Sequence, residues 1–337
     1  MAYRSLMFFH KPLMFTDYYV RAYRLVLEDD FDVYHAHDLN TLPVAVAAAR
    51  KTGARLVYDS HELYPEVSTL SRLESRVWKT LERRLIRRPD QVITVCESIA
   101  GELSSRYAVP KPLILLNCPP RTELPEQGAI NVLRIAAGLV DSDEPIVLYQ
   151  GGFADHRGLP ELVEAARHFH RGTLVLMGWG KLEAQLAAQI EDLGLRERVI
   201  MIGPADPSEL ASYTAGADIG VIPYKAVGLN NYYTTPNKLF EYILAGLPVA
   251  GSRFPELRRV IEGYKLGTLF DPNDPQDIAL AINYMLDNRE AMAQMRANTA
   301  RAAGELTWEH QAEKLLGVYG AITNGALVAD PVPSLRR

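Results

Sequence analysis

The chain has 337 residues, of which 48% are hydrophobic and 23% are charged, so it is globular in composition and long enough for two domains. Its formal net charge of −5 argues against non-specific nucleic-acid binding, and we expect no nucleic-acid partner. No apolar run is long enough to span a membrane, and the first residues lack the order of a signal peptide. Cys96 and Cys118 lie in apolar, strand-like runs, which predicts reduced thiols and a cytoplasmic location.

The first third of the chain alternates strand and helix patterns. Residues 1–31 have no clear period apart from a predicted helix over residues 16–28. Strands are then predicted at residues 32–38, 54–62, 91–96 and 112–118. The intervening helices are predicted at residues 41–51, 68–88 and 98–107. This succession predicts a parallel sheet with right-handed crossovers.

A second α/β series follows a proline- and glycine-containing linker between residues 119 and 144. Strands are predicted at residues 145–152, 173–180, 199–204, 219–224, 247–252 and 267–272. Helices are predicted to start near residues 159, 181, 208, 237 and 255, and the chain after Asp271 is mostly helical through Gly320. We therefore predict domains at 1–125 and 126–303, with residues 304–337 forming a helix that returns toward the first domain and a frayed tail.

The stretch from Leu229 to Ala250 combines a polar loop, a short helix and a strand. Thr235 suits a helix N-cap before a proline at the first helical position, and Gly246 suits the helix end. Helical periodicity places Lys238 and Glu241 on a face opposite the apolar residues. A free helix start with Lys238 suits a phosphate, and Glu241 one turn later suits the hydroxyls of a ribose. The alternative is an ordinary amphipathic helix with a solvated Lys238–Glu241 pair.

Glycines follow several predicted strands of the second half, where a doubly wound sheet binds its ligands. They are Gly151, Gly152, Gly178 and Gly203. Glycine lets a ligand approach the backbone closely, and Arg157 after the first of these strands is suited to a phosphate. Each turn alone also fits a tight turn with a surface arginine, whereas their repetition along one edge indicates a cleft for an extended ligand.

Two strands of the first half end in histidine and carboxylate residues, His35-Ala36-His37-Asp38 and Asp59-Ser60-His61-Glu62. Neighbouring parallel strands bring these ends together, and His35 and His37 point to the same side of a strand. Three interpretations stay open: a metal site completed by nearby carboxylates, a structural role for the imidazoles, or substrate contact by His61.

The motifs together resemble the retaining GT-B glycosyltransferases of the family called glycosyl transferases group 1, over nearly the whole chain. The motifs that carry the resemblance are HAHD, DSHE, ITVCESI, LLNCPP, YQGGFADHRGLPELVEA, MGWG, ADIGVIPY, PNKLFEYILAGLPV and TWEHQAEKLLGVYG. The resemblance implies a GT-B-like fold of two doubly wound Rossmann-type domains facing a cleft. It also implies a nucleotide-diphosphate sugar as donor, a glycan or lipid-linked acceptor, no cofactor and no metal.

The resemblance also assigns roles residue by residue. His61, Arg157 and Lys238 are the expected catalytic residues, with His61 facing the donor sugar and the two cations facing the diphosphate. The expected substrate-binding residues are Gly151, Gly152, Gly178, Gly203, Tyr233, Thr234, Thr235, Asn237 and Glu241. Glu241 matches the second member of a family carboxylate pair, whereas Tyr233 stands in place of the first. Gly152 stands where arginine is usual and Arg157 where lysine is usual.

A further departure concerns the start of the chain. Family members carry a strand, a glycine-rich loop and further βα units before the HAHD strand, so we expect an incomplete first domain of four strands beside a second domain of six. Residues 1–31 are then expected to pack less well than the rest. A non-catalytic nucleotide-sugar-binding or interaction protein therefore stays open as an alternative. A dinucleotide-dependent oxidoreductase is disfavoured because no G-x-G-x-x-G follows an early strand.

Residues 71–88 form a basic stretch with a row of leucine and valine side chains. Leu73, Val77, Leu81 and Leu85 share one helical face, which predicts a core helix whose basic rim is solvated. The alternative is peripheral contact with an anionic membrane through residues 71–88. The oligomeric state is not predicted.

Overall fold

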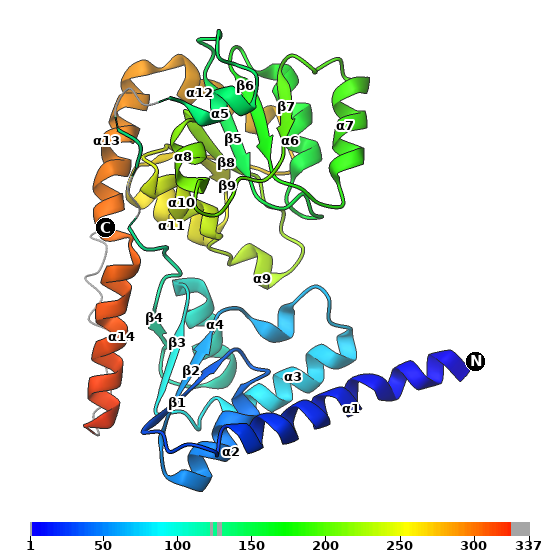
Figure 1. The fold of residues 1–337 in the computed structure, drawn as a ribbon, viewed down its shortest axis with the longest axis vertical. Helices are drawn as coiled ribbons and strands as arrows, with labels where there is room; N and C mark the ends of the chain where they lie inside the picture. The colour runs from blue at the N-terminus through cyan, green and yellow to red at the C-terminus, as the bar shows by residue number, and fades with distance from the viewer. Residues whose placement is uncertain (1, 122–123, 127–129, 325–337) are drawn as a thin grey trace. The chain divides into compact units, whose positions relative to one another are not determined.

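The computed structural model describes residues 2–121, 124–126 and 130–324 (Figure 1). These residues form two compact units, one containing the chain up to Leu115 together with the helix from Glu313 on, and the other containing Leu116–Ala312. Each unit has its own parallel β-sheet, with four strands in the first and six in the second, as predicted. No helix in the described part of the chain is long and apolar enough to cross a membrane.

The sheet of the first unit has the strand order β1-β2-β3-β4, and all its strands are parallel. Its strands are β1 (Val33–His37), β2 (Arg55–Ser60), β3 (Gln91–Thr94) and β4 (Leu113–Ile114). The connecting helices are α2 (Leu42–Thr52), the 3₁₀ turn η1 (Tyr64–Glu66), α3 (Arg72–Leu85) and α4 (Glu97–Tyr107). These elements confirm the predicted alternation, with ends shifted by a few residues.

The chain begins with one helix, α1 (Ala2–Leu25), where the sequence pattern predicts a helix over residues 16–28 only. The helix packs on α2, and the Phe15 ring meets the Trp78 ring edge-on with centroids 5.5 Å apart. Among the side chains described in α1, the exposed large apolar ones are Leu13, Met14, Tyr18, Val20 and Leu25. From Leu13 on, α1 therefore combines exposed apolar side chains with the packed Phe15, and the expectation that residues 1–31 pack less well than the rest stays a prediction.

Helix α3 corrects the predicted core face of the basic stretch. Leu73 and Val77 are 64% and 58% exposed, whereas Trp78 and Glu82 are buried. Trp78 packs edge-on against Tyr64, and Glu82 accepts hydrogen bonds from two buried tyrosine hydroxyls. The predicted stripe is therefore wrong at Leu73 and Val77, whereas Leu81 and Leu85 are half-buried. A hydrogen-bonded glutamate takes the place of an apolar residue in the core.

Helix α14 (Trp308–Thr323) continues past Gly320, where the predicted helix ends. Its Val318 and Ile322 side chains share an apolar cluster with Val57 and Ile93 of the first sheet. The predicted frayed tail lies, from residue 325 on, outside the described residues.

The sheet of the second unit has the order β10-β9-β8-β5-β6-β7, again with all strands parallel. Its strands are β5 (Ile146–Gln150), β6 (Thr173–Met177), β7 (Val199–Ile202), β8 (Ile219–Ile222), β9 (Val249–Ser252) and β10 (Gly267–Phe270). Its helices are α5 (Val132–Ala136), α6 (Leu159–Ala165), η2 (Ala166–His168), α7 (Glu183–Asp192), α8 (Leu210–Ala215), α9 (Leu229–Tyr232), α10 (Asn237–Leu244), α11 (Pro255–Gly263), α12 (Pro275–Asp287) and α13 (Arg289–Glu305). The chain order reverses between β5 and β8, which is where open α/β sheets bind ligands.

Candidate functional site

One edge of the second sheet lacks side chains at three neighbouring strand ends. The last residues of β5, β6 and β7 are Cα partners across the sheet: Gln150, Met177 and Ile202. The residues that follow them are Gly151, Gly178 and Gly203. The predicted row of glycines therefore lies along one edge, beside the point where strand order reverses.

Two of these glycines are required by the backbone. Gly178 has φ +152°, and a Cβ there would lie 2.0 Å from the carbonyl oxygen of Gly151. Gly151 has φ +123°, and its Cβ would lie 3.1 Å from the Nζ of Lys238. Gly203 has open space around it, so its substrate-binding role stays a prediction. The edge near Gly151 thus brings bare backbone close to a lysine amine.

Lys238, in the first turn of α10, is buried, with 6% of its surface exposed. Its Nζ lies 3.7 Å from the centroid of the Tyr149 ring and 5.1 Å from that of Tyr224. The prediction that this helix face is free is therefore wrong for Lys238, and Ala245 is buried as well. Periodicity treats lysine as polar, but aromatic faces accept a cation at short range.

Arg157 is a second cation that contacts the Tyr224 ring, with its guanidinium 4.2 Å from the ring centroid. Burial lowers the pKa of Lys238, and the nearby positive charge of Arg157 lowers it further, although Glu241 acts in the opposite direction. Within the described ranges, neither cation forms an ion pair with a carboxylate. Two cations that are not ion-paired with a carboxylate among the described residues make this edge attractive to a phosphate group.

The start of α10 differs from the predicted one. Pro236, rather than Thr235, is the N-cap residue, and no side chain caps this helix end. Thr234 and Thr235 are half-buried in the loop before it. The helix therefore starts one residue later than the Thr-Pro pattern predicts.

Glu241 is half-buried and belongs to a chain of side-chain hydrogen bonds. The Nε2 of Gln150 donates to the Oε2 of Glu241 at 2.6 Å, and the Oε1 of Gln150 accepts from Thr214 at 2.8 Å. Gln150 is almost fully buried, so its amide has a fixed orientation. This arrangement holds one oxygen of Glu241 and leaves its other oxygen for a ligand.

A cavity of about 460 Å³ borders Glu241 and Asn237. Its other lining residues are Asn117, Cys118, Pro119, Pro120 and Trp308. The Asn117 amide donates to the Oδ1 of Asn237 at 3.1 Å, which fixes the start of α10 against the 117–120 segment. The exposed Asn237 and half-buried Glu241 thus share a polar wall of one hollow.

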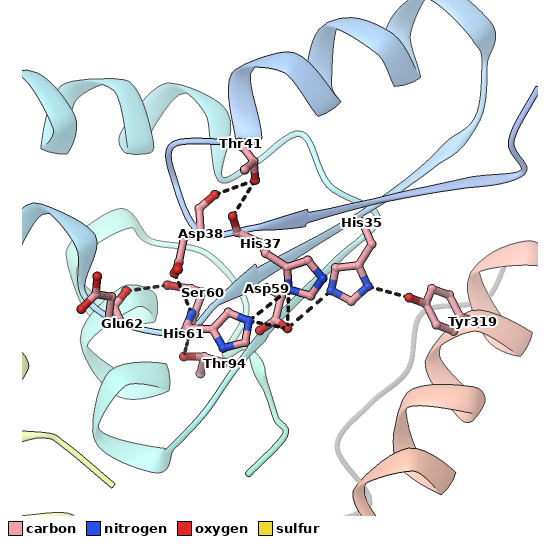
Figure 2. Close-up of polar contacts among 10 residues, drawn as sticks. All are labelled: His35, His37, Asp38, Thr41, Asp59, Ser60, His61, Glu62, Thr94 and Tyr319. Atoms are coloured by element: carbon pink, nitrogen blue, oxygen red, sulfur yellow. Dashed lines mark hydrogen bonds and ion pairs between the residues drawn. The ribbon is translucent and has the colours of Figure 1, made fainter. Parts of the chain in front are cut away.

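The histidine and carboxylate side chains of the first unit do come together, as the strand ends predict (Figure 2). The Nε2 of His61 lies 3.2 Å from the Oδ2 of Asp59 and 3.0 Å from the Nδ1 of His37. The backbone N–H of His61 donates to the Oδ1 of Asp38 at 3.0 Å. The hydrogen bond to Asp59 raises the pKa of His61 against the effect of burial. Burial alone would raise the pKa of Asp59, but its histidine neighbours lower that pKa to about 2.

Two family models match the chain. The model described as "Glycosyl transferases group 1" matches residues 134–302, half of the chain, and a "Glycosyl transferase 4-like domain" model matches residues 2–119. The chain belongs to the glycosyl transferases group 1 family.

Relatives and solved structures agree with this assignment. The glycosyltransferase is 25% identical over 314 residues to D-inositol 3-phosphate glycosyltransferase 1 of Catenulispora acidiphila, covering 88% of this chain and 73% of that protein. Sucrose-phosphate synthase of Thermosynechococcus elongatus superposes with a TM-score of 0.71 at 20% identity, covering 88% and 75% of the two chains. Alr3699/HepE of Anabaena, solved in complex with UDP and glucose, gives a TM-score of 0.73 at 19% identity, covering 91% and 81%. The predicted GT-B fold is confirmed.

Tyr233, the departure noted in the sequence, caps the end of α9 in this glycosyltransferase. Its ring is half-buried and lies 5.6 Å from the ring of Tyr232, which in turn meets Phe254 edge-on. An aromatic pair therefore occupies the place where the family pattern has a carboxylate.

Sequence reasoning missed several residues that hold the site of this glycosyltransferase together. They are Tyr149, Gln150, Thr214 and Tyr224. A polar Gln150 at the end of the apolar strand IVLYQ was a visible signal. The two tyrosines gave none, because aromatic residues at strand ends are ordinary core residues.

Proposed function

We propose that this glycosyltransferase transfers a sugar from a nucleotide-diphosphate donor to an acceptor hydroxyl, with retention of the anomeric configuration. The observation that carries the proposal is the pair of cations Lys238 and Arg157. They share the Tyr224 ring beside the bare backbone of Gly151, without a carboxylate partner among the described residues. A diphosphate supplies the missing negative charge.

Glu241 suggests how the donor is oriented on α10. Its oxygen not held by Gln150 is suited to accept hydrogen bonds from the two hydroxyls of a ribose. The order from Lys238 to Glu241 along α10 then matches the order from diphosphate to ribose in the donor. The solved relative Alr3699/HepE, whose structures include UDP and UDP-glucose, supports a donor of this class.

The proposed chemistry needs stabilisation of the departing diphosphate. When the bond between the anomeric carbon and the phosphate oxygen breaks, negative charge grows on the diphosphate and positive charge on the sugar. Arg157, together with Lys238 once the bound diphosphate has favoured its protonated form, stabilises the leaving group by charge that is in place before the bond breaks. We propose that transfer itself needs no metal ion or cofactor, since these two residues supply the positive charge.

His61 is proposed to act on the sugar and acceptor side of the reaction. Asp59 orients its ring through Nε2, and Asp38 fixes its backbone. A histidine held by a carboxylate can stabilise positive charge and position a sugar hydroxyl. We assign it to turnover and not to nucleotide affinity.

The acceptor is proposed to be a glycan or a lipid-linked molecule. Helix α3 supports the proposal of contact with a lipid surface, because its Leu73 and Val77 side chains are exposed. They lie among exposed arginines, namely Arg72, Arg76 and Arg83. Two buried cysteine thiols and a nucleotide-sugar donor fit an enzyme on the cytoplasmic side of a membrane. Sedimentation with anionic phosphatidylglycerol vesicles tests this surface, and equal sedimentation with neutral vesicles would exclude a charge-based contact.

A thermal-shift screen against nucleoside diphosphates and their sugar conjugates tests the proposed donor class. We expect stabilisation by at least one of these ligands and none by NAD. Donor hydrolysis, measured by release of the nucleoside diphosphate, then separates an enzyme from a non-catalytic relative. Binding without any turnover would favour the non-catalytic alternative, for which Tyr233 in the carboxylate position is the structural argument.

A further inference from the structure

Three histidine side chains and one aspartate of the first unit come together from two neighbouring strands (Figure 2). His35 and His37 lie two residues apart on β1, and Asp59 and His61 lie two residues apart at the end of β2. The two strands are parallel, with His37 as the Cα partner of Asp59. Residues two apart share a face of a sheet, so the topology places all four side chains on the same face.

The distances around the Asp59 carboxylate suit one small cation, and His61 joins this cluster through Asp59 and His37. The Oδ2 of Asp59 lies 3.5 Å from the Nε2 of His35, 3.5 Å from the Nδ1 of His37 and 3.2 Å from the Nε2 of His61. The nitrogens of His37 and His61 are 3.0 Å apart. Ligand atoms around a tetrahedral zinc ion with bonds of roughly 2.0 to 2.1 Å lie about 3.3 to 3.4 Å from one another. One ligand atom from each of His35, His37 and Asp59 also lies within 4.8 Å of the other two.

His35 supplies an independent sign of a missing ligand. Its Nε2 is buried and has no hydrogen-bond partner, although it faces the Asp59 carboxylate. Its other nitrogen, Nδ1, lies 2.5 Å from the hydroxyl of Tyr319. A metal-binding histidine uses its second ring nitrogen in this way, because an outer partner fixes the tautomer and the ring orientation. An Nδ1–H that donates to Tyr319 leaves the lone pair of the buried Nε2 directed at the cluster.

We propose that His35, His37, Asp59 and His61 bind one divalent transition-metal ion, with zinc as the ion that the ligand set fits best. Three imidazole nitrogens and one carboxylate oxygen form a tetrahedral N₃O set, which favours zinc over the oxygen-preferring magnesium and calcium. The side chains of His37 and His61 are 61% and 39% exposed, which gives the ion a path from solvent.

The site has a consequence that rests on the proposed function. A metal ion bound between the Nε2 of His61 and the Asp59 carboxylate breaks the contact that orients the His61 ring for its proposed role. The ion is therefore no part of sugar transfer but inhibits it, and a chelator restores transfer. Metal binding itself is independent of the donor, because all four ligands lie in the first unit and the donor residues lie in the second.

Binding is tested with the full chain after dialysis against EDTA and removal of the chelator. Titration with zinc chloride, followed by calorimetry, should show one site per chain. Titration with cobalt chloride should produce the intense visible absorption of tetrahedral cobalt, which reports the coordination geometry directly. The double variant His35→Ala/His37→Ala should lose at least 100-fold in zinc affinity, and Tyr319→Phe should lose about 10-fold, as outer-shell changes do.

His170→Ala is the matched control, because His170 is an exposed histidine of the second unit that pairs with Asp287. It should bind zinc like the wild type. Circular dichroism of the double variant checks folding, and His37→Gln provides a milder change at the exposed ligand.

Failure of the wild type to bind zinc at micromolar concentration would overturn the proposal. Equal affinity in the double variant and the wild type, or an octahedral cobalt spectrum, would overturn it as well. Loss of transfer activity with intact zinc binding would count against the proposed function alone.

Discussion

The buried amide of Gln150 holds the carboxylate of Glu241 through one hydrogen bond of 2.6 Å between Nε2 and Oε2. Gln150 is itself fixed from the other side, since its Oε1 accepts a hydrogen bond from Thr214. The carboxylate that we propose to face the donor is thereby held by a strand end rather than by the solvent. The relationship joins β5 and α10 at the edge where the strand order reverses.

Glu241→Ala should weaken nucleoside diphosphate binding by about 1 to 3 kcal/mol, the usual loss when hydrogen bonds to a charged acceptor disappear. Folding should change little, because Glu241 is only half-buried. Calorimetry measures the affinity, and Glu262→Ala on the exposed side of α11 is the control. Equal affinity in Glu241→Ala and the wild type would remove Glu241 from the ribose role.

The sequence predicted the parts of this fold that depend on repeated local patterns. All ten strands were placed correctly, because buried parallel strands are nearly continuous apolar runs between turn residues. Topology alone puts the carboxyl ends of parallel strands at one edge, and the functional roles assigned to the residues there stay predictions. His37, Asp59 and His61 met there as expected.

The burial of polar side chains was not predictable in the same way. Lys238 and Glu82 are both buried. Periodicity placed Lys238 on a solvent-facing side of its helix, and nothing in the sequence singled out Glu82. Their burial depends on partners far away in the sequence, such as the Tyr149 ring for Lys238 and the Tyr107 hydroxyl for Glu82. A helical period reports hydrophobicity and carries no information on such partners.

Neutralising either cation should show which part of the nucleotide the cations bind. Lys238→Met and Arg157→Met should each weaken nucleoside diphosphate binding much more than binding of the bare nucleoside, because the cations act on the diphosphate alone. Methionine keeps most of the buried aliphatic volume of Lys238. Lys181→Met, at an exposed lysine paired with Asp155, is the control. Equal weakening of both ligands would show that the cations are structural.

Lys238 should also take up a proton when the diphosphate binds. Burial and Arg157 lower its pKa in the free protein, and the negative charge of the ligand raises that pKa again. Between the two pKa values, the free lysine is largely neutral and the bound lysine is charged, so binding consumes a proton. Calorimetry over a series of pH values, in buffers of different ionisation enthalpy, counts this proton. The uptake should vanish in Lys238→Met, and its persistence there would assign it to another group.

His61→Ala should lower turnover and leave nucleotide affinity nearly unchanged. His61 lies in the first unit, whereas the proposed nucleotide-binding residues lie in the second. Donor hydrolysis or sugar transfer, measured with EDTA present, should fall by about 10²-fold or more, the usual size of a positioned histidine's contribution. His170→Ala should match the wild type in both measurements. An unchanged rate in His61→Ala would make His61 a structural strand-end residue.

Glu82 should be a stability residue of the first unit, because its buried carboxyl accepts hydrogen bonds from Tyr58 at 2.9 Å and from Tyr107 at 2.6 Å. Glu82→Ala leaves both hydroxyls buried without an acceptor and should cost about 2 to 4 kcal/mol of unfolding free energy. Hydrogen exchange of the amides in β2 and α4 measures the loss. Arg83→Ala, at the exposed neighbouring position, should change exchange very little.

The pH dependence of stability separates the effect of Glu82 ionisation from the effect of its hydrogen bonds and packing. Burial raises the pKa of Glu82 in the folded protein above its usual value of 4.5, so the folded state binds more protons than the unfolded state between these two pKa values. The wild type must therefore lose stability as pH rises through that window, because ionisation is easier after unfolding. Glu82→Gln has no such ionisation, and its stability relative to the wild type should increase as pH rises from 4.5. A constant difference between the two proteins across this range would show that burial does not shift the pKa of Glu82.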